Sequence, residues 1–223
     1  CKSAGAAHAI HALYLGIICL ALAAAWGRFW PEAPSGWRWL APLLFAGAPI
    51  VVWSATVAYN DLALAAYEVL ALYGVALWAR TGRSGWLWAG ALALGFALGT
   101  KMTAMVEAAL LAPIIAAVAL RAKMGLGGTV RRLLVWGATA VAVASPWYIR
   151  SFILTRNPVY PFFFNLFPNT RFWNAEIAAS YAHHQAEFGA GHGWQHFLAV
   201  PWDLLVNQAR FTDGGEAFRV LFG

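Results

Sequence analysis

Residues 60–79, NDLALAAYEVLALYGVALWA, decide the fold class, because this apolar stretch has the length of a membrane span and still contains Asp61 and Glu68. A helix needs about 20 mostly apolar residues to cross a bilayer. The rest of the chain has a similar composition: 61% of its 223 residues are hydrophobic and 11% are charged. A soluble domain of this length needs more polar surface, so the composition predicts an integral membrane protein.

Six stretches of the chain have the composition expected of spans: 8–27, 39–58, 60–79, 86–100, 103–120 and 132–152. The stretch 86–100 is short, and we expect it to stop inside the bilayer or to be covered by its neighbours. The predicted fold class is therefore all-α. It consists of a polytopic transmembrane helix bundle over residues 1–152, and an outer-facing segment with short amphipathic helices over residues 153–223.

The short connections between these stretches are rich in basic residues: Arg28, Arg38, Arg80, Arg83, Arg121, Lys123, Arg131 and Arg132. If the six spans alternate, these connections share one side, and the positive-inside rule makes that side cytoplasmic. The segment after about residue 153 then lies outside the cytoplasm. The formal net charge of +6 suggests anionic lipids as partners. No nucleic-acid-binding motif or basic groove pattern is present, so we expect no nucleic acid partner.

The ionisable residues within the apolar stretches fall on the opposite side. They are functional candidates because a charge in hydrocarbon is costly. Asp61 follows Asn60 at the start of a predicted helix, where an N-cap role and a functional role are both open. Glu68 lies two turns further along the same face, about 10 Å deeper, where capping cannot explain a carboxylate. The candidates are Asp61, Glu68, Lys101, Glu107 and Arg150.

Lys101 and Arg150 are the candidate cations of this side. Lys101 ends a glycine-containing segment and suits a lipid phosphate or a carboxylate such as Glu107, although a snorkelling interfacial lysine is the alternative. Arg150 ends the run SPWYIR at 145–150, where its planar fork suits phosphate and its alternative role is a headgroup-facing anchor. Prolines 146, 158 and 161 predict that the last helix ends near this run in a turn-rich exit.

Two amphipathic stretches follow, over 173–188 and 194–206, and both are expected to lie on the outer leaflet. His192 and His196 have the spacing of a metal-binding pair, with His183, His184 and Glu187 upstream. No closed set of ligands emerges, so we expect surface histidines, no metal site and no cofactor.

Several of these runs together resemble bacterial membrane glycosyltransferases of family 39, the protein mannosyltransferase-like and aminoarabinose transferase-like enzymes of the GT-C fold. The resemblance covers about residues 50–165 and depends on the order and spacing of short elements. These are AYNDLAL at 58–64, LALY at 70–73, GFALGTKMTA at 95–104, SPWYIR at 145–150 and NPVYP at 157–161.

The resemblance implies an inverting transferase of the bacterial inner or plasma membrane. Such an enzyme moves a sugar from a polyprenyl-phosphate donor to a lipid, glycan or protein acceptor on the outer face. Lys101 matches the threonine-lysine element near the donor site, and Tyr148 and Arg150 belong to the Pro-Trp-Tyr element, so these three are candidates for binding the donor phosphate. Asp61 and Glu68 are the candidate catalytic carboxylates. The family's catalytic base is an aspartate in the first outer loop, and we expect this chain to be a fragment that begins after that loop.

Two other classes of function remain open. A polytopic transporter or lipid flippase would use Asp61, Glu68 and Lys101 as an ion or proton relay. A non-catalytic assembly subunit would use its outer helices to bind a partner.

Overall fold

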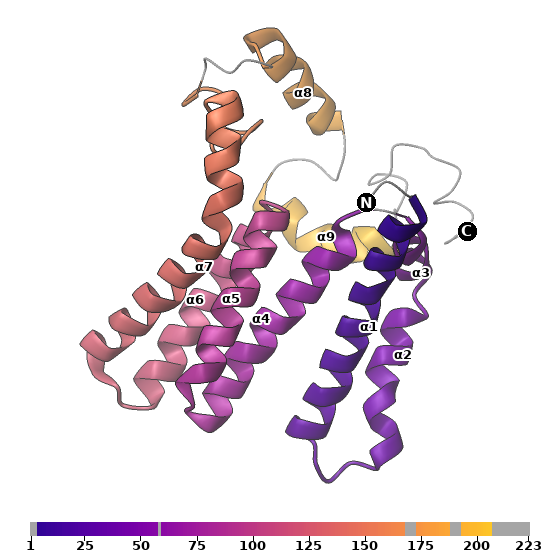
Figure 1. Ribbon diagram of the computed structural model, residues 1–223, viewed down its shortest axis with the longest axis vertical. Coiled ribbons are helices and arrows are strands. Elements are labelled where there is room, and N and C mark those ends of the chain that lie inside the picture. Colours follow the sequence, from indigo (N-terminus) through magenta and orange to yellow (C-terminus); the bar gives the residue numbers. More distant parts are fainter. Residues whose placement is uncertain (1–3, 58, 168–172, 188–192, 207–223) are drawn as a thin grey trace. The chain divides into compact units, whose positions relative to one another are not determined.

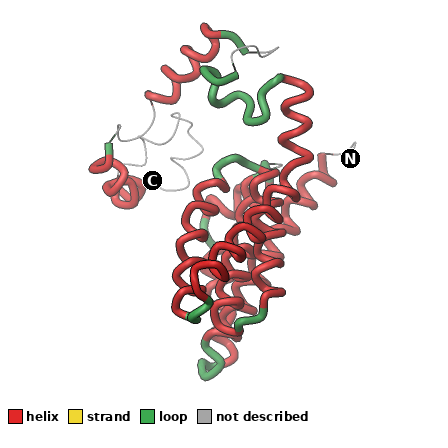
Figure 2. The backbone as a smooth tube through the Cα atoms, turned by 90° about the vertical axis from the view of Figure 1, so that its left-hand side faces the viewer, coloured by secondary structure: helices red, strands yellow, loops and turns green. Residues whose placement is uncertain are grey.

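The computed structural model describes residues 4–57, 59–167, 173–187 and 193–206, and these residues contain helices and turns but no β-strand (Figure 2). The chain divides into two compact units, Cys1–Ile149 and Arg150–Gly223. The all-α class is therefore confirmed for the described part of the chain.

Helices occupy all six predicted ranges (Figure 1). α7 begins in the first unit and ends in the second. The helices of the first unit are α1 (Ala4–Phe29), η1 (Ser35–Trp39), α2 (Leu40–Ala46), α3 (Pro49–Thr56), α4 (Asp61–Thr81), α5 (Ser84–Thr100), α6 (Ala104–Arg121) and α7 (Gly125–Thr155).

Three helices of the described chain are long and apolar enough to cross a membrane: His8–Phe29 within α1, α4 and α6. A fourth crossing is reached if the bent pair formed by Ser35–Ala46 and Pro49–Thr56 is one span. α5 has 17 residues, as expected for the short member of the set. These helices support a membrane protein, whereas six crossings remain a prediction.

The second predicted span, 39–58, is not one straight helix. Its two halves are bent by 71° relative to each other at residues 47 and 48. Ala48 has an extended backbone because the residue before a proline is disfavoured in the helical region, and Pro49 then opens α3. The predicted span is therefore bent, and Pro49 is the physical reason.

α4 is the central helix of the first unit, because it contributes to both hydrophobic clusters. In one cluster Leu62 and Ala66 pack with Ile18 of α1 and Val51 of α3. The other cluster joins α4 to α5, α6 and α7 and includes Val75, Trp78, Leu94, Ile115 and Trp136. Packing on several sides fixes the two ends of α4, and Asp61 is its first residue.

α4 and α5 cross at a pair of glycines. A Cβ added at Gly74 would lie 2.7 Å from the Cα of Gly90 and 2.8 Å from the Trp86 carbonyl oxygen. These neighbours are backbone atoms, which cannot rotate away as a side chain can. The glycines therefore let the two helices approach closely.

α7 continues through a proline. Pro146 lies inside the helix, which continues to Thr155. A proline inside a helix deprives the carbonyl four residues earlier of its usual N–H donor. Here the Ser145 hydroxyl donates to that carbonyl, on Ala142, over 2.8 Å. This local replacement lets α7 continue through Pro146 to Thr155, three residues beyond the predicted span 132–152.

The second unit begins with the turn that ends α7. Arg156 adopts a left-handed backbone (φ 61°), and Asn157, only 1% exposed, organises the residues around it. Its amide nitrogen donates to the Phe162 carbonyl over 2.8 Å, and its side-chain oxygen accepts from the Val159 N–H over 2.9 Å. The turn-rich exit predicted after residue 155 is confirmed, although it starts after a longer helix than expected.

Asn157→Leu is expected to destabilise this turn by about 2 to 4 kcal/mol, because two part-buried hydrogen bonds are lost and their backbone partners are left unpaired. Hydrogen exchange of the amides of residues 156–163 measures the effect. Asn174→Leu is a suitable control, because its side chain also bonds to a backbone N–H but at an exposed position. Unchanged protection in Asn157→Leu would show that the turn forms without this side chain.

Two further helices, α8 (Ala175–Glu187) and α9 (Trp194–Val206), lie at the two predicted amphipathic stretches. On α9 the apolar side chains Trp194, Phe197, Leu198 and Trp202 are strongly exposed, as suits a helix that lies on a membrane surface. Phe188, the last residue of the predicted amphipathic stretch 173–188, lies outside the described residues.

Candidate functional site

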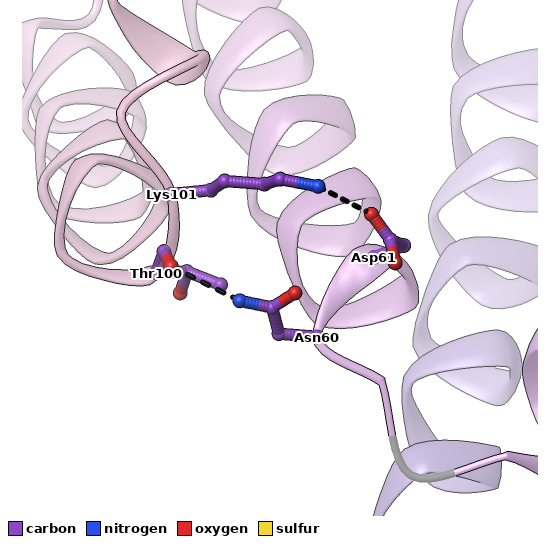
Figure 3. Close-up of polar contacts among 4 residues, drawn as sticks. All are labelled: Asn60, Asp61, Thr100 and Lys101. Atoms are coloured by element: carbon purple, nitrogen blue, oxygen red, sulfur yellow. Dashed lines mark hydrogen bonds and ion pairs between the residues drawn. The ribbon is translucent and has the colours of Figure 1, made fainter. Parts of the chain in front are cut away.

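Four residues from two helix ends form what we call the polar cluster: Asn60, Asp61, Thr100 and Lys101 (Figure 3). The Lys101 ammonium donates to the Asp61 carboxylate, with Nζ and Oδ1 2.9 Å apart. Beside it, the Asn60 amide nitrogen donates to the Thr100 carbonyl over 3.2 Å. Two contacts therefore join the beginning of α4 to the end of α5.

The start of α4 differs from the capping interpretation. Asn60 is the N-cap residue, but its side chain makes no capping hydrogen bond and instead contacts Thr100. Asp61 is the first helical residue, where a negative charge also complements the positive end of the helix dipole. The Asn60 side chain therefore joins α4 to α5 and does not cap α4.

α5 ends at Thr100 because Lys101 has an extended backbone (φ −154°, ψ 138°). The Thr100 hydroxyl donates to the Phe96 carbonyl over 2.8 Å, so it is used within its own helix. Lys101 stands at the carboxyl end of α5, where the dipole favours a cation. Both charges of the pair thus lie where their helices favour them.

The pair is accessible: the Lys101 side chain is 45% exposed and that of Asp61 is 51% exposed. Exposed ion pairs contribute about 0 to 1 kcal/mol to stability, so stability alone is a weak reason for this pairing. An ammonium has three N–H donors and a carboxylate accepts at two oxygens. The ion pair uses one N–H of Lys101 and one oxygen of Asp61. The cluster can therefore bind both an anion and a hydroxyl group.

Tyr148 lies at the same end of α5. Its hydroxyl donates to the Leu98 carbonyl over 3.1 Å, in the last turn of the helix. The carbonyls of a last turn lack helical partners, which explains why this one accepts from a side chain. The indole ring of the adjacent Trp147 lies against Gly99. Tyr148, a candidate for binding the donor phosphate, therefore lies near the carboxyl end of α5, which Lys101 follows.

Comparisons with protein-family models, with curated proteins and with solved structures find no match to this chain.

Glu68 lies on α4 and Glu107 on α6, two helices that contribute to the same hydrophobic cluster. We call them the carboxyl pair. Both residues are half-buried, and within the described part of the chain Oε2 of Glu107 is buried without a hydrogen-bond partner. Glu107 was one possible carboxylate partner for Lys101, and Lys101 contacts Asp61 of α4 instead.

Arg150 lies in the second compact unit, near the end of α7, and its side chain is exposed. Among the described residues, the Arg150 side chain forms no hydrogen bond or ion pair. A guanidinium in this state is free to bind an external anion. Convergence of Arg150 with Lys101 on one phosphate remains a prediction.

The histidines of the second unit include the predicted metal-binding spacing of His192 and His196. His192 lies outside the described residues, as does the side chain of Glu187. Among the residues that the structure describes, no three His, Cys, Asp or Glu side chains form a group that could hold a metal ion.

Two polar contacts between α1 and its neighbours were not predicted from the sequence. His11 is 5% exposed, and its Nδ1 donates to the Ser54 carbonyl over 2.7 Å, which places a proton on that nitrogen. The hydroxyls of Tyr14 and Tyr67 are 3.0 Å apart. Polar residues within an apolar helix are the signal that could have marked both positions.

Proposed function

We propose that the protein is a membrane glycosyltransferase that moves a sugar from a polyprenyl-phosphate donor to an acceptor at the membrane face. The observation that carries this proposal is the accessible pairing of Asp61 with Lys101 across two helix ends. The order of the motifs around these residues, which resembles family 39, supports it. The proposal includes six crossings of a bacterial inner or plasma membrane and an outer position for residues 153–223.

The chemistry proposed is one displacement at the anomeric carbon. The acceptor hydroxyl forms the new bond to that carbon while the bond to the phosphate oxygen breaks, and the electron pair leaves with the phosphate. The proton of the hydroxyl passes to a carboxylate, for which Asp61 is the described candidate. The free N–H donors of Lys101 stabilise the charge that develops on the phosphate.

The other candidate residues have supporting roles in this proposal. Arg150 adds a second cation for the phosphate, and Tyr148 positions the end of α5 through its bond to Leu98. Glu68 contributes a deeper polar contact on the same helix as Asp61. The acceptor is a lipid, glycan or protein, and no cofactor is required by this chemistry.

Asp61→Asn in the full-length protein is expected to lower transfer about 100-fold or more, because an amide cannot accept the proton. Release of short-chain polyprenyl phosphate from a panel of polyprenyl-phosphate sugars measures the rate. Glu32→Gln is the matched control, since Glu32 is an exposed carboxylate that precedes η1 and lies outside the polar cluster. Wild-type rates in Asp61→Asn at equal expression would remove Asp61 from the reaction.

The carboxyl pair favours a second candidate, a transporter or flippase with a proton relay. Carboxyl groups on apolar membrane helices are candidate members of a proton relay. A relay would make uptake of protons into vesicles depend on Glu68 and Glu107. For a transferase, we expect Glu68→Gln and Glu107→Gln to leave the proton permeability of reconstituted vesicles unchanged, as read by an enclosed pH-sensitive dye. Proton uptake by the wild type that either variant abolishes would favour the transporter.

A further inference from the structure

A cavity of about 260 Å³ lies between α5 and α7, away from the polar cluster. It is lined by Ser84, Leu87, Trp88, Arg131, Arg132, Val135 and Trp136. Ser84 is the first residue of α5 and Thr100 the last, so the cavity and the polar cluster lie at opposite ends of this 17-residue helix. At a rise of 1.5 Å per residue these ends are roughly 24 Å apart.

The wall of the cavity contains hydrogen-bond donors without acceptors. Trp136 is 5% exposed, and its indole N–H has no partner within the described part of the chain. Nε of Arg132 is likewise buried without a partner, while its Nη1 donates to the Gly128 carbonyl over 3.2 Å. A buried donor left unpaired costs free energy, so an acceptor group bound here would remove a penalty.

The charge at the cavity is positive and not neutralised. Arg131 is exposed, and among the described residues neither Arg131 nor Arg132 forms an ion pair. The backbone N–H groups that begin α5 add partial positive charge beside Ser84, and the side chain of the N-cap residue Arg83 makes no capping hydrogen bond. Two guanidinium groups, a hydroxyl and a helix start are donors suited to the oxygens of a phosphate.

We propose that this cavity binds the phosphate headgroup of an anionic membrane lipid. The volume is small for a whole drug-sized ligand but well above the roughly 30 Å³ of one water, and so suits a headgroup. Apolar side chains form the rest of the wall, and Trp88 is 49% exposed, as suits contact with acyl chains. Basic pockets between membrane helices recognise lipid headgroups in this way. The proposal is independent of the transferase activity.

The experiment titrates the purified protein in detergent micelles with phosphatidylglycerol and with phosphatidylcholine, and counts bound lipids by native mass spectrometry. The double variant Arg131→Gln/Arg132→Gln is expected to lose at least about 10-fold in affinity for phosphatidylglycerol, because two charge-assisted contacts are removed. Arg121→Gln/Lys123→Gln is the matched control. It removes the same charge from exposed residues that do not line the cavity, and we expect a change below about 2-fold.

Equal losses in the two double variants would overturn the proposal, because a general attraction of lipid to basic residues would then suffice. Arg131→Gln alone changes only an exposed side chain, so it tests the cavity without risk to folding. We expect about a 3-fold loss of affinity for phosphatidylglycerol, and wild-type affinity would contradict the proposal.

Glycerol phosphate distinguishes a lipid from a soluble phosphate. We expect no saturable binding of it at millimolar concentration, and displacement of phosphatidylglycerol by glycerol phosphate would overturn the lipid assignment.

Discussion

Lys101→Ala is expected to lower sugar transfer about 30- to 1,000-fold, which corresponds to the roughly 2 to 4 kcal/mol that one preorganised group contributes to a transition state. The physical reason is the negative charge that develops on the leaving phosphate when the bond to the sugar breaks. Lys101 also holds the Asp61 carboxylate at 2.9 Å, so its removal affects both halves of the proposed reaction. Initial rates of transfer by full-length wild-type and variant proteins at matched expression measure the loss.

Three controls separate this role from a general loss of charge. Lys123→Ala removes an exposed lysine from the connection between α6 and α7 and is expected to transfer at the wild-type rate. Lys101→Arg keeps the charge and is expected to retain part of the activity. The double variant Asp61→Asn/Lys101→Ala is expected to lose less than the product of the single losses, because the two side chains are in contact. Strictly multiplicative losses would mean that the two residues act independently.

Gly74→Leu is expected to destabilise the first unit by about 3 kcal/mol or more, at the upper end of the range for overpacked cores. The added side chain would meet the backbone of Gly90 and Trp86, and relief requires α4 and α5 to separate. That separation would also displace the polar cluster, which joins the ends of these two helices. Thermal unfolding of the protein in detergent, followed by the loss of monodisperse protein on gel filtration, measures the effect.

Gly16→Leu is the matched control, because a Cβ added at Gly16 of α1 meets nothing within 4 Å. We expect this variant to unfold at or slightly above the wild-type temperature, since glycine is a poor helix former. Similar midpoints for Gly74→Leu and wild type would contradict the close approach of α4 and α5.

Local sequence signals predicted much of the helical structure. The apolar run after Asn60-Asp61 predicted the start of α4, and the short stretch before Lys101 predicted the brief α5. The effects of two prolines were not predicted, because they depend on neighbouring groups. Pro49 bends the predicted span 39–58, whereas Pro146 stays inside α7 with the help of the Ser145 hydroxyl.

The residues of the candidate site were named from the sequence, but the contacts between them were not. Asp61 and Lys101 were both candidates, yet the carboxylate named as a possible partner of Lys101 was the nearby Glu107 and not Asp61, which is far from it in the sequence. Sequence proximity favours such guesses, whereas the packing of α4 against α5 decides the contact. The carboxyl pair on α4 and α6 was missed for the same reason, since helix neighbours cannot be read from spacing along one chain.

The most direct test of the proposed transferase site is the binding of short-chain polyprenyl phosphate, the leaving product, because it does not depend on which sugar is transferred. Binding is measured with the full-length protein in nanodiscs of phosphatidylcholine, for wild type, Lys101→Ala, Lys123→Ala and Arg131→Gln/Arg132→Gln. We expect saturable binding by wild type, a loss of at least about 10-fold in Lys101→Ala, and wild-type affinity in the other two variants. Equal affinity of wild type and Lys101→Ala would contradict the placement of the donor phosphate at the polar cluster.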